Sequence, residues 1–171
     1  GYKDLWEKGN FIITSSVVAQ RGCFEIIGLF DASKEILGSE DMDMWYRIAE
    51  RYKLKYIDEP LVQYLARRSG FNRSNVERAY ASAAAVIQKH QPVLAKYYAN
   101  DKDILKRKWS KFYWSFGLTL LDCRDPKGAH VQFKKALGYA PFSIKARVYY
   151  LLTRLDPALV LRLKKLKQRI A

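Results

Sequence analysis

The strongest constraint on the fold is a change of sequence pattern near Ser74. Before it, short β-branched runs alternate with turn signals; after it, apolar residues recur at the spacing of helices. The charge changes at nearly the same place. Residues 1–75 carry 11 Lys/Arg and 11 Asp/Glu, whereas residues 76–171 carry 20 and 6, which accounts for the net charge of +14. The sequence therefore predicts two regions, 1–74 and 75–171, with different roles.

The first region has the pattern of a mixed α/β structure. "FIITSSVVAQ" (11–20) and "LKYIDEPLVQYLA" (54–66) are rich in β-branched and aromatic residues and contain turn signals, so both predict strands. Between them, "RGCFEII" predicts a short helix that ends at Gly28. The predicted fold class is thus α+β, with a partial α/β portion followed by an all-α subdomain.

The second region has the pattern of helices alone. "NVERAYASAAAVIQKHQ" predicts a helix that ends before Pro92, and "DKDILKRKWSKFYWSFGLTLLD" predicts another. Over 110–143, eight residues have the spacing of one tetratricopeptide repeat: Tyr113, Phe116, Gly117, Leu120, Ala129, Phe133, Ala136 and Pro141. A single repeat cannot bury its apolar face alone, so it is expected to pack on the preceding helix and on one at about 144–155. An ordinary helical hairpin is the alternative.

The C-terminal segment 156–171 predicts a basic amphipathic helix. Asp156 is placed as its N-cap and Pro157 as its first helical residue. Its apolar face carries Leu159, Leu163, Leu166 and Ile170, and lysines and arginines cover the rest. Such a helix can lie on an anionic membrane surface. It can equally dock its leucines on the preceding helices, and both readings stay open.

Another helix is predicted in the first region by "GSEDMDMWYRIAERY" (38–52), whose first turn is strongly acidic. Ser39 is a favourable N-cap, and the helix dipole favours Glu40, Asp41 and Asp43 in the first turn. Asp43 and Arg47 are spaced for a surface ion pair. Helix capping alone explains these acids, so their number does not establish catalysis.

The order of motifs in the first region resembles a known family. "GNFIITSSVVAQRGCFEIIGLFD" and "SEDMDMWYRIAERYKLKYIDEPLVQY" resemble the C-terminal half of the catalytic domain of family 2 glycosyltransferases, which are inverting enzymes with the GT-A fold. The likeness extends from Gly9 to about Ser74. It implies that Asp41 is the general base that deprotonates the acceptor hydroxyl, with Glu40 in support. Trp45, Thr14 and Ser15 are then expected at the acceptor, although Glu40 and Trp45 have structural roles as alternatives.

The resemblance also implies parts that this chain does not contain. The nucleotide-binding half and the Asp-x-Asp motif for Mg or Mn are expected before Gly1, so any metal ligands lie outside the chain. Asp41-Met42-Asp43 matches that motif by coincidence, because neighbouring side chains on a helix diverge by about 100°. Arg67 stands where the family often has His, which leaves metal dependence open. Arg67 and Arg68 are predicted to neutralise the diphosphate.

The predicted function is therefore that of a fragment of an inverting glycosyltransferase. It would transfer a single sugar from a nucleotide-sugar donor to a sugar or lipid-linked acceptor, in bacterial cell-surface polysaccharide or glycolipid synthesis. The isolated chain is expected to be inactive. The alternative is a non-catalytic helical interaction module that binds protein or an anionic membrane surface. Nucleic-acid binding is not expected, because no basic stretch is interleaved with aromatic residues in a recognition pattern.

The expected location is cytoplasmic, peripheral on the inner face of the cell membrane. No apolar run approaches the roughly 18 residues that span a bilayer. The two cysteines, Cys23 and Cys123, show neither a metal-ligand spacing nor a disulfide framework.

Overall fold

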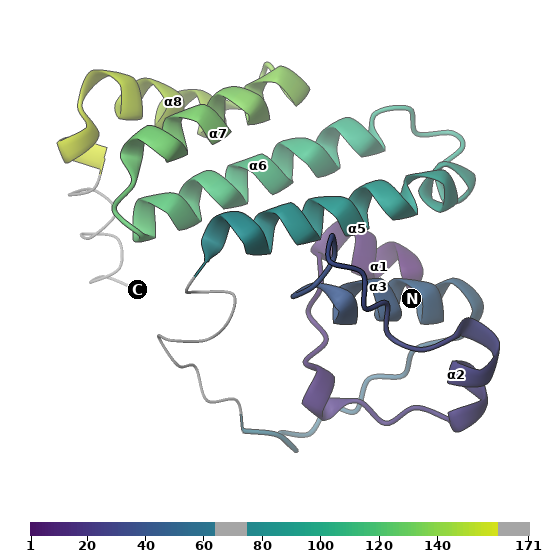
Figure 1. Cartoon of the computed structure of the whole chain (residues 1–171). Coiled ribbons are helices and arrows are strands. Elements are labelled where there is room, and N and C mark those ends of the chain that lie inside the picture. The colour runs from purple at the N-terminus through teal and green to yellow at the C-terminus, as the bar shows by residue number, and fades with distance from the viewer. Residues whose placement is uncertain (64–74, 161–171) are drawn as a thin grey trace. The chain divides into compact units, whose positions relative to one another are not determined.

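The computed structural model describes residues 1–63 and 75–160, which form helices and connecting segments (Figure 1). The chain divides into two compact units, Gly1–Tyr97 and Tyr98–Ala171. The first boundary predicted from sequence, at residue 74, precedes the long helix α5 (Val76–Tyr97), which belongs to the first unit.

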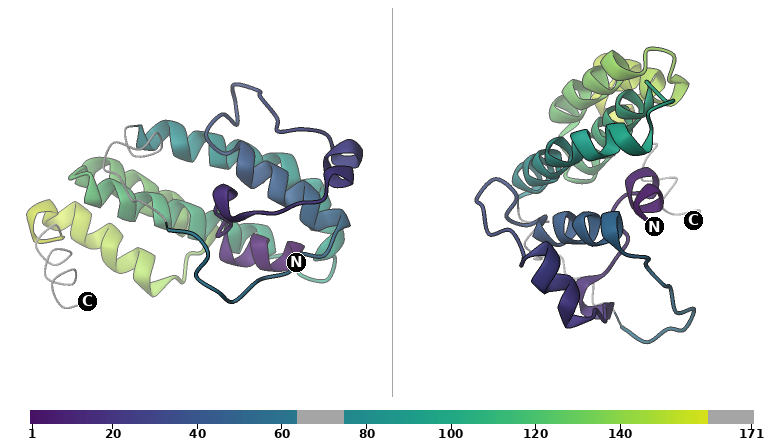
Figure 2. Two further views of the ribbon diagram at one scale, coloured as in Figure 1. Left: turned by 90° about the horizontal axis from the view of Figure 1, so that it is seen from below. Right: turned by 90° about the vertical axis from the view of Figure 1, so that its right-hand side faces the viewer.

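The first unit is built around α3 (Glu40–Arg51), which packs against three other helices. These are α1 (Tyr2–Lys8), α2 (Arg21–Ile27) and α5 (Figures 1 and 2). More than half of α3 is buried: Met42, Asp43, Met44, Trp45, Tyr46, Ile48 and Ala49. These side chains lie on more than one face of the helix. A helix buried on most sides belongs to the core of its unit.

Aromatic side chains join α1 to the helices around it. Trp6 is fully buried, with its ring centroid 5.8 Å from that of Tyr46. The Tyr46 hydroxyl donates a hydrogen bond to the carbonyl of Leu5, at 3.3 Å. Tyr2 stacks on Tyr97, with centroids 4.6 Å apart. These contacts fix both ends of α1 in the core.

The predicted α/β portion is wrong, because no residue among 1–63 and 75–160 lies in a strand. In the first segment predicted as a strand, Ile13 (φ −83°, ψ 116°) and Val17 (φ −95°, ψ 132°) are extended. A short 3₁₀ turn, η1 (Thr14–Ser16), lies between them. Residues 53–63 form neither a helix nor a strand. Extended backbone becomes a sheet only when a neighbouring strand takes its hydrogen bonds.

The predicted start of α3 at Ser39 is confirmed, whereas the predicted end of α5 before Pro92 is wrong, and tertiary contacts act at both places. Ser39 is the N-cap of α3, but its hydroxyl bonds to that of Ser82 on α5, at 2.9 Å, instead of to an amide of its own helix. Helix α5 continues through Pro92 to Tyr97, although an interior proline costs about 3 kcal/mol. Fully buried Leu94 holds the last turns, as does the hydrogen bond from the Tyr97 hydroxyl to the carbonyl of Glu50. In both places a tertiary contact overrides the local signal.

The second unit contains three helices in sequence: α6 (Ile104–Asp122), α7 (Pro126–Tyr139) and α8 (Ile144–Leu155). Helix α6 packs on α7, and α7 packs on α8 (Figures 1 and 2). Arg124 turns the chain with a positive φ of 61°, and the Asp125 carboxylate accepts the amide hydrogen of Gly128 at 2.9 Å to cap α7. The helix pair predicted over 110–143 is thus present, while its tetratricopeptide likeness stays a prediction.

Small residues allow α6 and α7 to approach closely. Ala129 and Ala136 are fully buried, and a Cβ added at Gly117 would lie 2.6 Å from the ring of Phe133. Phe133 is itself fully buried. The predicted segment 156–171 begins with Asp156, whose carboxylate accepts the amide hydrogen of Leu159 at 2.8 Å. Residues 161–171 lie outside the described part of the chain.

Substituting Gly117→Ala should destabilise the second unit by about 1–2 kcal/mol. The clash with Phe133 costs about 1–3 kcal/mol and exceeds the helix propensity that alanine adds, of at most about 1 kcal/mol. The matched control is Gly138→Ala in α7, where an added Cβ meets nothing within 4 Å and stability should rise by about 0.5–1 kcal/mol. Urea denaturation measures both. Equal stabilisation by the two substitutions would contradict the close packing at Gly117.

Candidate functional site

The carboxylate of Asp41 lies at the start of α3 and is half-buried. Its Oδ2 accepts a hydrogen bond from the Thr14 hydroxyl at 3.2 Å, and its Oδ1 accepts one from the amide of Met42 at 2.6 Å. The structure thus brings together two residues predicted at one site although 27 positions separate them. A carboxylate with about four lone-pair positions keeps further capacity to accept a hydroxyl.

The neighbouring Glu40 fixes the turn that precedes the helix. Its Oε2 accepts the amide hydrogen of Gly38 at 2.5 Å. Gly38 has a φ of 98°, which residues other than glycine rarely adopt. Glu40 therefore holds the chain that enters α3.

The remaining predicted residues have different positions. Ser15 is exposed next to Thr14, within the turn η1. Trp45 is only 4% exposed and meets the ring of Phe30 edge to face, at 6.1 Å. Its indole Nε1 is buried and has no hydrogen-bond partner among the described residues. Trp45 is therefore a core residue of α3. Arg67 and Arg68 lie outside the described residues.

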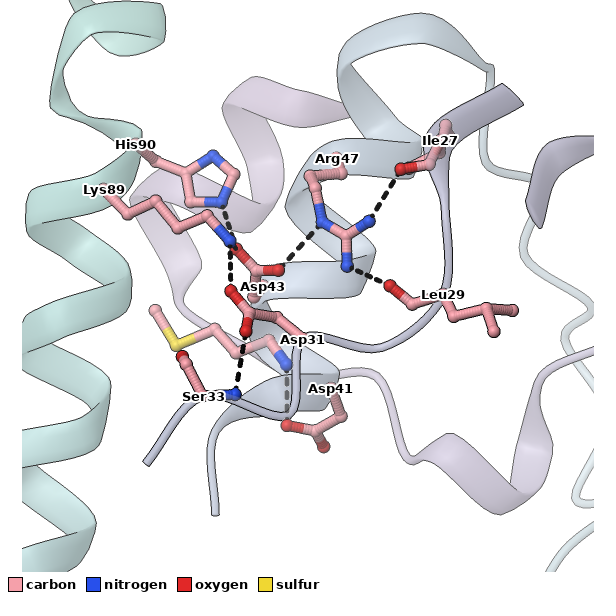
Figure 3. A network of polar contacts seen from close by, with 10 residues as sticks. Ile27, Leu29, Asp31, Ser33, Asp41, Asp43, Arg47, Lys89 and His90 are labelled. Carbon is pink, nitrogen blue, oxygen red and sulfur yellow. Dashed lines mark hydrogen bonds and ion pairs between the residues drawn. The ribbon is translucent and has the colours of Figure 1, made fainter. Parts of the chain in front are cut away.

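Asp43 is the centre of a buried polar network that the sequence did not reveal (Figure 3). Its side chain is fully buried, and its Oδ2 accepts a hydrogen bond from Arg47 Nε at 2.8 Å. Its Oδ1 lies 2.9 Å from Lys89 Nζ and 3.0 Å from His90 Nε2. We call this network, completed by Asp31, the Asp43 cluster. The predicted pair of Asp43 with Arg47 is confirmed, but its predicted surface position is wrong because α5 covers it.

Arg47 extends the cluster to the end of α2. Its Nη1 donates to the carbonyl of Ile27 at 3.0 Å, and its Nη2 donates to the carbonyl of Leu29 at 2.9 Å. These carbonyls lie on either side of Gly28, where α2 ends and no intrahelical partner is available. One guanidinium therefore binds a carboxylate and caps a helix, which requires its planar, multiple-donor geometry.

Lys89 extends the cluster to the loop after α2. Its Nζ lies 2.8 Å from Asp31 Oδ2, and Asp31 Oδ1 accepts the amide hydrogen of Ser33 at 2.9 Å. The two carboxylates of the cluster face two cations, so its charges balance. Because ionised Asp43 can only accept hydrogen bonds, His90 donates to it through Nε2.

These contacts shift the ionisation of the cluster. Burial alone would raise the pKa of Asp43, but hydrogen bonds from His90, Lys89 and Arg47 outweigh it and hold that pKa well below its usual value. The Lys89 ammonium, with the amide of Ser33, lowers the pKa of Asp31 to about 2. Burial lowers the pKa of Lys89, yet its two carboxylate partners raise it above its ordinary value.

The geometry gives the neighbouring carboxylates of α3 separate roles. Asp43 is buried and saturated by donors, so it cannot take a proton from a substrate. Asp41 lies apart from the cluster (Figure 3) and remains accessible beside Thr14. Among residues 1–63 and 75–160, no three His, Cys, Asp or Glu side chains gather into a group that could hold a metal ion. In the same residues no helix has the length and apolar character needed to cross a membrane.

One sequence signal could have located the partner of Asp43. His90 lies between Ile87 and Leu94 on the buried face of α5, at helical spacing. A polar side chain on an apolar face needs a buried hydrogen-bond partner. The signal does not say which residue that partner is, because Asp43 is 47 positions away.

Comparison with known proteins assigns no family to this chain. No protein-family model, curated protein or solved structure matches it. The resemblance to family 2 glycosyltransferases therefore remains a prediction that depends on the quoted motifs. The geometry around Asp41 provides a separate line of argument.

Replacing Asp43 by Asn should destabilise the first unit by about 1.5–3 kcal/mol, because the buried side chain loses the charge that accepts hydrogen bonds from Arg47, Lys89 and His90. Hydrogen exchange followed by mass spectrometry should show lost protection in α3 and α5, with α6 and α7 unchanged. Asp58→Asn, at an exposed position, is the control and should change stability by less than about 0.5 kcal/mol. A loss of less than about 1 kcal/mol in the free energy of unfolding of Asp43→Asn would show that the cluster is dispensable for stability.

The stability of the first unit should also fall in acid. The folded pKa values of Asp31 and Asp43 lie below the value of about 3.9 expected for an unfolded chain. The unfolded state therefore binds protons first, so the stabilisation is complete above about pH 5 and is lost as pH falls towards 2. Urea denaturation at a series of pH values measures this loss. The slope should be shallower in Asp43→Asn, and an unchanged slope would remove Asp43 from the effect.

Proposed function

We propose that this chain carries the acceptor side of an inverting glycosyltransferase and that Asp41 is its general base. The reaction would transfer a single sugar from a nucleotide-sugar donor to a hydroxyl of a sugar or lipid-linked acceptor. The observation that carries this proposal is the accessible Asp41 carboxylate, which already accepts a hydrogen bond from the hydroxyl of Thr14 at 3.2 Å. The motifs quoted from residues 9–74 supply the reaction class.

The environment of Asp41 suits proton abstraction from an acceptor. A general base must lie within hydrogen-bond reach of the proton it removes. The amide of Met42 holds one oxygen, so the other is presented in a fixed direction next to Thr14. The acceptor hydroxyl would bind at this oxygen, lose its proton to Asp41 and attack the anomeric carbon. The nucleoside diphosphate then leaves from the opposite side.

The donor side of the reaction lies elsewhere in this proposal. Donor binding, and any Mg or Mn that supports it, would come from a segment outside this chain. Arg67 and Arg68 are proposed to approach the departing diphosphate. The Asp43 cluster would support the site indirectly, by joining α3 to α5 and to the loop around Asp31.

The basic second region would hold the enzyme where lipid-linked acceptors reside. Residues 76–171 carry nearly all of the net positive charge. We place the protein at the inner face of the cell membrane, with segment 156–171 on the anionic surface. The second candidate function, a non-catalytic helical interaction module, is favoured by one observation: residues 1–63 and 75–160 form helices without a sheet.

The decisive variant for the transferase proposal is Asp41→Asn in the intact gene product that contains residues 1–171. Transfer from a panel of nucleotide-sugar donors should fall about 10²–10⁴-fold, as expected for loss of a general base, while donor binding persists. Glu35→Gln, an exposed acid in the turn before α3, should leave the rate unchanged. Retained turnover in Asp41→Asn would remove Asp41 from this role. Sugar transfer by residues 1–171 alone would show that no further half is needed.

A second variant tests the contact between Thr14 and Asp41. Thr14→Val keeps the shape of the side chain but removes the donor, and should lower kcat/KM by roughly tenfold, since a hydrogen bond to a charged group contributes about 1.5–3 kcal/mol. Thr14→Ser restores the hydroxyl and should recover most of the rate. Equal rates for the Val and Ser variants would show that the hydroxyl plays no part.

A further inference from the structure

Helix α8 has an inner face that its own unit covers. Ala146 is 1% exposed and Thr153 is 4% exposed. His130 of α7 lies within hydrogen-bond distance of Thr153, with Nδ1 to Oγ1 at 3.1 Å, and its ring stacks on that of Tyr150 with centroids 4.5 Å apart. The packing of α8 on α7 is therefore complete on this side.

The opposite face of α8 is an exposed aliphatic stripe. It consists of Ile144, Val148, Leu151 and Leu155, which are 78%, 46%, 44% and 78% exposed. Their spacing of four, three and four residues places them in one line along the helix. Phe142, 90% exposed, lies just before α8. Single exposed apolar residues are ordinary, but a continuous line of them with an aromatic residue at its end marks a contact surface.

Basic side chains border this stripe on both sides. At 100° per residue, Lys145 falls on one side, and Arg147 and Arg154 fall together on the other. Residues 143–155 contain no Asp or Glu. None of the three bases forms an ion pair within the described part of the chain, and Arg147 donates only to the carbonyl of Pro141, at 2.7 Å. Asp156, the next residue after α8, accepts the amide hydrogen of Leu159. Within α8 itself, the border of the stripe is therefore positively charged.

We propose that the exposed face of α8 docks on an anionic lipid bilayer. The aliphatic stripe and Phe142 would enter the boundary between headgroups and acyl chains, and the three bases would meet lipid phosphates. Docking on a second copy through the same face is disfavoured because it would oppose like charges. This surface is distinct from segment 156–171, and the proposal does not depend on the transferase reaction.

Vesicle flotation of the full chain tests the contribution of the aliphatic stripe to membrane binding. The protein should float with vesicles of phosphatidylcholine and phosphatidylglycerol, and much less with phosphatidylcholine alone. Ile144→Ser combined with Leu155→Ser should lower the partition coefficient on the order of tenfold, because two aliphatic side chains no longer leave water. A matched pair of single variants sharpens this test. Val148→Ser should weaken binding, whereas Val131→Ser on α7, at 48% exposure, should not.

The charged part is tested with a second matched pair. Lys145→Gln with Arg154→Gln should weaken binding to anionic vesicles on the order of tenfold, since each base near the surface contributes about fivefold. Lys127→Gln with Lys134→Gln removes the same charge from exposed positions of α7 and should have a smaller effect. Added salt should weaken binding of the wild-type protein.

Several results would overturn this proposal. The first is flotation of the Ile144→Ser/Leu155→Ser variant at the wild-type level, with circular dichroism showing that it is folded. Equal loss in Val148→Ser and Val131→Ser would also overturn it. A third such result is a wild-type protein that binds no vesicles and is a dimer in light scattering, while the Ile144→Ser/Leu155→Ser variant is a monomer. Because Asp41 variants test sugar transfer separately, an inactive protein that floats refutes the transferase proposal alone.

Discussion

The carboxylate of Asp43 is the contact on which the first unit depends. Three separate segments meet there: α3 supplies the acid, α5 supplies Lys89 and His90, and Arg47 connects it to the end of α2. A buried charge is tolerated only when its hydrogen bonds are satisfied, so these donors must arrive together. The same requirement sets the register of α3 against α5. The position of Asp41, two residues earlier on α3, follows from that register.

Local signals located many helices but not the contacts between them. Gly28 ends α2 because its φ of 86° is one that glycine adopts without strain, and Asp125 with Pro126 starts α7; both are readable from neighbouring residues. Ser39 is the predicted N-cap, but its hydroxyl bonds to Ser82 of α5 and not to an amide of α3. Pro92 misleads, because α5 continues past it and the carbonyl of Glu50 holds its last turn. Tertiary contacts thus override a capping preference and a helix-breaking residue.

The candidate site shows the same division between local and distant information. Family likeness grouped Thr14 with Asp41, and the two side chains lie in hydrogen-bond contact. It also grouped Trp45 with the acceptor, yet that ring is buried against Phe30. Helical spacing found Arg47 as the partner of Asp43, but no spacing rule connects Asp43 to His90, because they lie on different helices. A buried network becomes visible only once the helices are placed.

The strand predictions failed for a physical reason that concerns sheets in general. β-propensity measures how well a side chain fits a pleated, half-buried surface, and that surface exists only when neighbouring strands form it. Val18 is fully exposed, and Tyr56 and Leu61 are 80% and 67% exposed, so these side chains have no such surface in the described structure. Helices α6 to α8 differ because each closes its own hydrogen bonds and needs a partner only for one face. The helical half of the sequence could therefore be predicted locally, whereas the extended half required knowledge of what lies beside it.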